Sequence, residues 1–240
     1  LTGAYEKAAF IEKAGADMYF TAEFAKYKDM SADRFVDEVL VGAFGVKHVV
    51  CGYDFSFGKG GSGNPEQLLK LLSHYGVPLT VLPPVCVEGV AVSSTGLRAL
   101  ITAGDMETAR KHLGRPYGFY LPVTHGNRIG RTIGSPTVNQ RFPAERVVPA
   151  YGVYAAFCIV GGKTYAAVSN VGVKPTVNTE DKTPVCETHI FDFNGDLYGQ
   201  SVWVYLYKRI RAEKRFESVE ELSAQIAADK EAARLITEGV

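Results

Sequence analysis

The hydrophobic pattern of this 240-residue chain changes near Gly114, and this change constrains the fold more than any other feature. Before Gly114, apolar residues at helical spacing alternate with short apolar runs, which is typical of helices alternating with strands and predicts a parallel sheet. After Gly114, short runs with alternating apolar residues follow one another between glycine-rich and asparagine-rich turns. Several short strands in succession predict an antiparallel β-barrel. We therefore expect an α/β domain over residues 1–113 and a barrel domain over residues 114–240.

Capping residues predict where the helices begin. Four polar residues each precede an amphipathic stretch and are expected to be helix N-caps: Ser31, Asn64, Ser93 and Asp105. A further helix is expected over residues 4–14, and strands over residues 17–21, 46–50 and 79–82. In the barrel, strands are expected over residues 151–160, 163–168, 185–193 and 201–207.

A C-terminal helix is expected to pack on the barrel. Ser218 and Glu221 have the spacing of a capping box. The expected apolar stripe consists of Val219, Leu222, Ile226 and either Leu235 or Ile236. The chain also opens in a helix and without Met, whereas a nucleotide-binding sheet normally opens with a strand and a loop. The sequence is therefore expected to be a fragment of a longer protein.

Composition narrows the classes of function. Lys plus Arg and Asp plus Glu both total 26, so the chain lacks the basic excess of a nucleic-acid binder. No apolar run reaches the roughly 18 residues of a membrane-spanning helix, and no signal peptide is apparent. The four cysteines and five histidines complete no zinc pattern. We expect a cytoplasmic protein with reduced thiols, in which Cys158 and Cys186 belong to the core.

The segment HGNRIGRTIGSPTVN, from His125 to Asn139, combines residues suited to phosphate binding. Glycines such as Gly126 and Gly130 let a backbone approach a ligand closely, and the fork of Arg131 matches phosphate oxygens. Taken alone, these glycines also fit turns or bulges between strands, and the arginine also fits an exposed surface position.

Two neutral oxygen ligands follow in the same segment. Thr137 and Asn139 are two residues apart, so in an extended segment their side chains point to the same side. Such a pair suits Mg²⁺ that is already bound to phosphates, although either residue alone is more often a turn cap. Downstream, Glu187 in CETHIFDFNGDLYG is a carboxylate on an expected strand. It is a candidate general base, although a lone strand Glu usually faces water.

These segments resemble a known family in several ordered blocks. GRTIGSPTVN resembles the G-R-x-x-G-F-P-T-A-N signature of riboflavin kinases, with Ser135 in place of Phe and Val138 in place of Ala. SNVGVKPTV, ETHIFDFNGDLYG and RAEKRFESVEEL resemble later blocks of that family in the same order. Upstream, VVCGYDFSFGKGGSGN and VSSTGLRALITAGDMETARKHLGRPY resemble the FMN adenylyltransferase half of bifunctional bacterial FAD synthetases.

The resemblance implies a partial Rossmann-like nucleotidyltransferase domain followed by an antiparallel β-barrel riboflavin kinase domain with a C-terminal helix. It implies phosphorylation of riboflavin to FMN, with ATP as co-substrate and Mg²⁺ on the phosphates. Thr137 and Asn139 would hold the metal, and Gly126, Gly130 and Arg131 would shape the phosphate loop. Glu187 and Arg211 would be the catalytic residues. The flavin would be contacted by Glu213 and Phe216.

The resemblance also implies adenylylation of FMN to FAD, with the ATP of that reaction bound by Ser93, Ser94, Thr95 and Arg98. Without the family resemblance, these residues fit a routine helix cap beside one exposed arginine. The family's H-x-G-H block is missing, so the 240 residues alone are expected to make FMN and almost no FAD. The remaining alternative is a barrel that binds flavin or nucleotide without catalysis. A base and a metal pair favour an enzyme.

Overall fold

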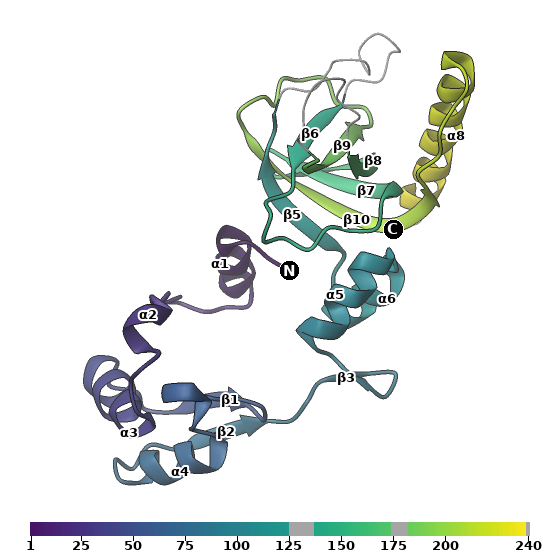
Figure 1. Ribbon diagram of the computed structural model, residues 1–240. Coiled ribbons are helices and arrows are strands. Elements are labelled where there is room, and N and C mark those ends of the chain that lie inside the picture. Colours follow the sequence, from purple (N-terminus) through teal and green to yellow (C-terminus); the bar gives the residue numbers. More distant parts are fainter. Residues whose placement is uncertain (125–136, 174–181, 239–240) are drawn as a thin grey trace. The chain divides into compact units, whose positions relative to one another are not determined.

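The computed structural model describes residues 1–124, 137–173 and 182–238 (Figure 1). The proposed phosphate-loop residues Gly126, Gly130 and Arg131 lie outside these described residues. The chain divides into two compact units. One comprises Leu1–Gly15 together with Val92–Val240, and the other comprises Ala16–Ala91. This division differs from the boundary that we expect after residue 113, which stays a prediction.

The unit over Ala16–Ala91 has α/β character. Its helices are α2 (Phe24–Tyr27), α3 (Ala32–Arg34), the π-helix η1 (Phe35–Ala43), the 3₁₀ turn η2 (Lys59–Gly61) and α4 (Pro65–Ser73). Its strands are β1 (Val49–Gly52), β2 (Leu79–Leu82), β3 (Cys86–Val87) and β4 (Val90–Ala91). β1 and β2 are parallel, as the alternation predicts. Leu68 and Leu72 of α4 are fully buried beside Val36 of η1.

The local predictions for this unit are partly confirmed. The Ser31 hydroxyl accepts a hydrogen bond from the Arg34 amide, and the Asn64 side chain accepts one from the Gln67 amide at 2.9 Å. The strand expected over residues 17–21 is wrong, because that segment forms no ladder with any described strand. The strand expected over residues 46–50 begins only at Val49. The apolar composition of that strand suggests full burial, but Val50 is 58% exposed.

The other unit contains the barrel. Its helices are α1 (Ala4–Lys13), α5 (Ser94–Ala103), α6 (Met106–Leu113) and α8 (Val219–Glu238). Its strands are β5 (Tyr117–Pro122), β6 (Val138–Arg141), β7 (Gly152–Val160), β8 (Lys163–Val173), β9 (Pro184–Ile190) and β10 (Ser201–Ala212). The sheet order is β5-β10-β7-β8-β9-β6, with antiparallel neighbours throughout. Thr124, just after β5, bridges to Asn139 of β6, so the barrel is nearly closed.

Both faces of β7 are apolar, because each packs against a different layer. Tyr154 and Cys158 point into the barrel core, where they are fully buried. Ala155 points outward and packs with Ala233 of α8. α8 lies along the outside of the barrel, against β7 and β8 (Figure 1). The alternation along β7 therefore places Val153 and Ala155 on the outer side of the barrel.

The C-terminal helix begins as predicted, but its apolar stripe is displaced. The Ser218 hydroxyl accepts from the Glu221 amide at 3.1 Å, while the Glu221 carboxylate accepts from the amide of Glu217 rather than that of Ser218. Val219 is mostly exposed, which corrects its assignment to the stripe. Of the two alternatives near the end of the helix, Leu235 is exposed and Ile236 packs on the barrel. Ala233 packs there too, and its small side chain lets α8 approach the strands closely.

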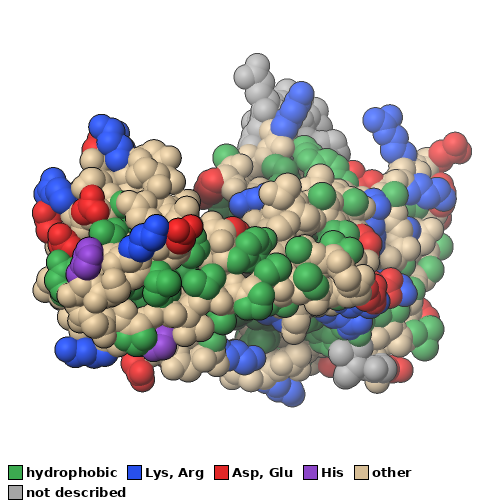
Figure 2. All heavy atoms as spheres, turned by 90° about the horizontal axis from the view of Figure 1, so that it is seen from below, with side chains coloured by type: hydrophobic (Ala, Val, Ile, Leu, Met, Phe, Trp, Pro, Cys, Tyr) green, Lys and Arg blue, Asp and Glu red, His purple; other side chains and the backbone are tan. Residues whose placement is uncertain are grey.

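The burial of two cysteines and the distribution of charged residues agree with what the composition of the chain suggests. Cys158 and Cys186 are buried and unpaired, and burial raises the pKa of the Cys158 thiol to about 12 and that of the Cys186 thiol to about 11. Charges of both signs are scattered over the face shown in Figure 2. Within the described residues, no helix has the length and apolar character needed to cross a bilayer.

Candidate active site

Glu187 lies in the middle of β9 between two polar neighbours. It stands directly opposite Asn139 of β6 and directly opposite Asn170 of β8. Paired residues of adjacent antiparallel strands share one face, with Cβ atoms roughly 4.5–5.5 Å apart. Cys186 and Thr188, on either side of Glu187, are fully buried inside the barrel, so Glu187 points outward. We call Asn139, Glu187 and Asn170 the polar row.

Asn139 is fixed where the barrel closes. Its carbonyl oxygen accepts from the Thr124 amide at 2.8 Å and from the Thr124 hydroxyl at 3.2 Å. Its side-chain amide donates to the Thr137 carbonyl oxygen at 3.4 Å, and the residue is only 5% exposed. Thr137 immediately precedes β6 and is adjacent to Asn139. Their roles as metal ligands stay a prediction.

A hollow of about 490 Å³, part of it open solvent, adjoins Thr137. Its walls combine apolar, aromatic and polar residues: Val123, Thr137, Val138, Thr188, Ile190, Phe193, Gly195, Asp196, Leu197 and Tyr198. Half of these residues come from the turn between β9 and β10. This turn belongs to the family block ETHIFDFNGDLYG, but its sequence alone predicted no role for it. The signal for one lies in Phe193 and Tyr198, two aromatic residues in a segment otherwise rich in turn-forming residues.

Arg211 lies in line with the polar row. It stands opposite Val153 of β7, and Val153 stands opposite Asn170. Two β-bulges in β10 precede this position, and bulges redirect the side chains that follow them. The guanidinium binds Asp229 of α8, with Nε–Oδ1 at 2.9 Å and Nη2–Oδ2 at 2.7 Å.

The segment after β10 folds over the end of β8. A Cβ atom added to Gly172 of β8 would overlap the carboxylate of Glu213, so this carboxylate rests directly on Gly172. Burial raises the pKa of Glu213, and the nearby charge of Arg211 opposes that shift. The Arg211 guanidinium carbon is 5.8 Å from the centre of the Phe216 ring. The structure thus brings Arg211, Glu213 and Phe216 together at one end of the polar row.

Three other basic residues near the end of β10 have partners of their own. Lys208 binds Glu107 at 3.1 Å, Lys214 binds Glu221 at 2.9 Å, and Arg209 donates to the Tyr151 carbonyl oxygen. This arrangement is typical of a solvated strand end. A phosphate-binding cluster would present cations without acid partners.

The adenylyltransferase residues lie on a different element of the barrel unit. Ser93 caps α5 by accepting from the Gly96 amide at 3.1 Å, and Ser94, Thr95 and Arg98 follow within the first two turns. α5 packs against α6, at the other end of the barrel from β6 and β9 (Figure 1). The structure therefore groups these four residues but separates them from the polar row. Their role in ATP binding stays a prediction.

The site offers neutral oxygen ligands rather than a cage of carboxylates. No cluster of three His, Cys, Asp or Glu residues suited to a metal occurs among the residues that the structure describes. Mg²⁺ requires no such cluster when substrate phosphates supply most of its ligands. Thr137 and Asn139, adjacent to each other and next to the carboxylate of Glu187, fit a metal of this kind.

Comparison with known proteins assigns both parts of the chain. The family model described as riboflavin kinase matches residues 113–237, and the one described as FAD synthetase matches residues 1–96. The bifunctional riboflavin kinase/FMN adenylyltransferase of Bacillus subtilis (strain 168) is 34% identical over 235 residues, which are 97% of this chain and 74% of that protein. The protein of the same description from Escherichia coli (strain K12) is 37% identical over 237 residues, which are 98% of this chain and 74% of that protein.

A solved structure shares the fold. A crystal structure from Streptococcus pneumoniae, described as a macrolide-efflux protein, superimposes with a TM-score of 0.84 and 32% identity. The match covers 97% of this chain and 75% of that one. That description is specific to the S. pneumoniae protein, and the likeness to this chain lies in the fold. The two family models and the extent of the curated relatives agree, and the chain belongs to the family of bifunctional riboflavin kinase/FMN adenylyltransferases.

Proposed function

We propose that this chain transfers the γ-phosphoryl group of ATP to the 5′-hydroxyl of riboflavin, which yields FMN and ADP. The observation that carries the proposal is the position of Glu187, a carboxylate flanked in register by two amide side chains on the outer face of the barrel. A second activity, adenylylation of FMN to FAD, follows from membership of the same bifunctional family. A barrel that only binds flavin is not favoured, because the family is one of catalysts.

Glu187 would act as the general base. Its carboxylate accepts the proton of the 5′-hydroxyl as the hydroxyl oxygen bonds to the γ-phosphorus and the bond to the bridging oxygen of ADP breaks. Proton acceptance by a positioned side chain typically accelerates such a step by about 10²–10⁴. Asn139 and Asn170 flank the carboxylate and would hold it and the hydroxyl in line. Phosphoryl transfer depends chiefly on such positioning and on charge neutralisation.

Arg211 would stabilise the charge on the transferring phosphoryl group. Arginine donates hydrogen bonds in a planar fork that suits phosphate oxygens, and donors held in place before reaction cost no reorganisation during it. Glu213 and Phe216, at the same end of the polar row, would contact the flavin. Thr137 and Asn139 would hold Mg²⁺, which when bound neutralises the phosphate charge. The hollow beside Thr137 suits the base of ATP, since its lining combines apolar side chains with polar ones.

The direct test is chromatography of riboflavin incubated with Mg·ATP and the protein. The proposal expects FMN to accumulate with time and in proportion to protein concentration. Unchanged riboflavin, despite measurable flavin binding, would favour the non-catalytic barrel. Formation of FAD by these 240 residues alone would overturn the expectation that the adenylyl-transfer site is incomplete here, without affecting the kinase assignment.

Removal of the proposed metal ligands gives a second prediction. Thr137→Ala and Asn139→Ala are each expected to raise the Mg²⁺ concentration needed for half-maximal FMN formation, because each removes one oxygen ligand. Two residues that serve one ion should not act independently. The double variant should therefore be little worse than the poorer single variant, as measured by Mg²⁺ titration of the initial rate. Additive losses at unchanged Mg²⁺ dependence would contradict a shared metal.

Gly172 provides a third prediction. Gly172→Ala adds a methyl group where the Glu213 carboxylate rests, and should displace that carboxylate. If Glu213 contacts the flavin, the KM for riboflavin should rise while the KM for ATP stays unchanged. The same substitution in a Glu213→Ala background should add no further rise, because the displaced group is already absent. An equal effect in both backgrounds would show that Gly172→Ala acts on the barrel itself.

A further inference from the structure

α8 holds a buried carboxylate against the barrel. Asp229 is only 5% exposed, although it is an acidic side chain. Buried carboxylates require partners, because desolvation of an unpaired charge is costly. Asp229 has two, since it accepts from Nε and Nη2 of Arg211 and from the side-chain amide of Gln225 at 3.0 Å. The two oxygen atoms of the Asp229 carboxylate thus hold the guanidinium group of Arg211 in one orientation.

The ion pair leaves part of Arg211 available. Arginine has five N–H donors. Two of them, on Nε and Nη2, bind Asp229, and one on Nη1 binds the Ala212 carbonyl oxygen at 2.9 Å. One N–H on each of Nη1 and Nη2 therefore has no protein acceptor among the described residues. The side chain keeps 23% of its surface exposed, so these donors are accessible to a ligand.

The register places Arg211 at one end of the polar row, three strands from Glu187. Arg211 stands in line with the polar row, with Val153 between it and Asn170. Glu213 and Phe216 lie at the same end. From this geometry we infer that Asp229 is a positioning residue for phosphoryl transfer, which acts by clamping Arg211 so that its two remaining donors face the reacting groups. This inference rests on the proposed kinase function, and it makes α8 part of the catalytic apparatus.

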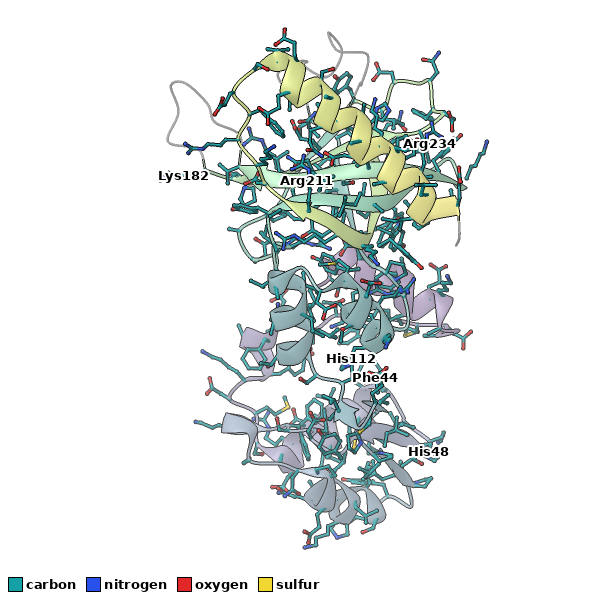
Figure 3. All side chains as sticks on the ribbon, turned by 90° about the vertical axis from the view of Figure 1, so that its right-hand side faces the viewer. Phe44, His48, His112, Lys182, Arg211 and Arg234 are labelled. Atoms are coloured by element: carbon teal, nitrogen blue, oxygen red, sulfur yellow. The ribbon has the colours of Figure 1, made fainter. Side chains whose placement is uncertain are left out.

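A second ion pair on α8 supplies a matched control. Arg234 of α8 binds Asp192 through both of its terminal nitrogens, at 3.1 and 3.2 Å. It too fastens the helix to the barrel unit, yet neither partner adjoins the polar row. Figure 3 shows Arg211 and Arg234 at separate points beside α8. Loss of the Arg234–Asp192 pair should therefore affect only the attachment of the helix. Loss of the Arg211–Asp229 pair should affect both the attachment of the helix and the position of Arg211.

The experiment compares Asp229→Asn with Asp192→Asn in the 240-residue chain, at a temperature where both are folded by circular dichroism. We expect Asp229→Asn to lower kcat by about 10- to 100-fold, the range found when a group that orients a metal ligand is removed. The KM values for ATP and riboflavin should change little. Asp192→Asn should leave kcat unchanged. Wild-type kcat in Asp229→Asn, or equal losses in both variants, would overturn the inference.

A double-mutant cycle separates positioning from general damage. Arg211→Ala should lower kcat, and Asp229→Asn should add almost nothing in that background, because the side chain it positions is gone. If Asp229→Asn does not fold, Arg211→Lys tests the same geometry, since lysine cannot be gripped at two nitrogens. Wild-type kcat in Arg211→Lys would overturn the inference. Failure of the proposed function itself would look different, because the unmodified chain would then form no FMN.

Discussion

Glu187→Gln should lower the kcat of FMN formation by roughly 10²–10⁴, the usual contribution of a general base. The substitution keeps the size of the side chain and one of its acceptor oxygens, but it removes the group that takes the proton. Riboflavin binding should be nearly unchanged, because the amide still fills the place between Asn139 and Asn170. Rapid-quench measurement of a single turnover would check this, since it reports chemistry rather than product release.

Glu231→Gln serves as the control for this substitution. Glu231 is exposed on α8, so the same chemical change there should leave kcat at the wild-type value. A Glu187→Gln variant that kept more than roughly a third of the wild-type single-turnover rate would exclude Glu187 as the base, because that loss is far below the range for a general base.

The second large effect should come from Glu6, through stability. Its carboxylate accepts from both terminal nitrogens of Arg146, at 2.8 and 2.6 Å, and from the Tyr120 amide at 2.7 Å. Both charged side chains are at most 5% exposed. Glu6→Ala leaves the guanidinium buried without its anion, which typically costs about 3–5 kcal/mol. The unfolding midpoint of the barrel unit should fall by roughly 6–20 °C.

Differential scanning calorimetry would measure this effect, and Glu107→Ala is its control. Glu107 pairs with Lys208 in the same unit, but both side chains are about half exposed. Exposed pairs contribute little to stability, so the control should unfold near the wild-type temperature. Equal midpoints for Glu6→Ala and Glu107→Ala would mean that Arg146 finds other acceptors, and that α1 contributes less to the barrel unit than its contacts indicate.

The sequence predicted the elements whose signals are local. The caps at Ser31, Asn64, Ser93 and Asp105 each accept the expected backbone hydrogen bond, because N-capping depends only on residues three positions apart. The barrel and its C-terminal helix also follow from patterns within single segments. The strand expected over residues 17–21 fails for the opposite reason. A short apolar run becomes a strand only when another strand pairs with it, and the sequence of the run does not show whether such a strand is available.

The candidate site divides in the same way. Family blocks identified Asn139, Glu187 and Arg211, but their shared line across the barrel depends on register, which sequence does not give. For Arg211 the two bulges of β10 make simple alternation unreliable. Asp229 was missed altogether, since a lone Asp in an amphipathic helix usually faces water. The buried Glu6 was missed too, because its partner Arg146 is 140 positions away.

The pairing of Glu6 with Arg146 also bears on how the chain is made. α1 leaves the ribosome before β5 and before the segment that carries Arg146, with the whole of residues 16–91 synthesised in between. Until then the Glu6 carboxylate cannot bind the guanidinium group of Arg146, and short isolated helices are marginal in water. Domains fold as units during synthesis, so residues 16–91 have time to fold before α1 can pack against β5. The first helix of this chain is thus among the last to dock.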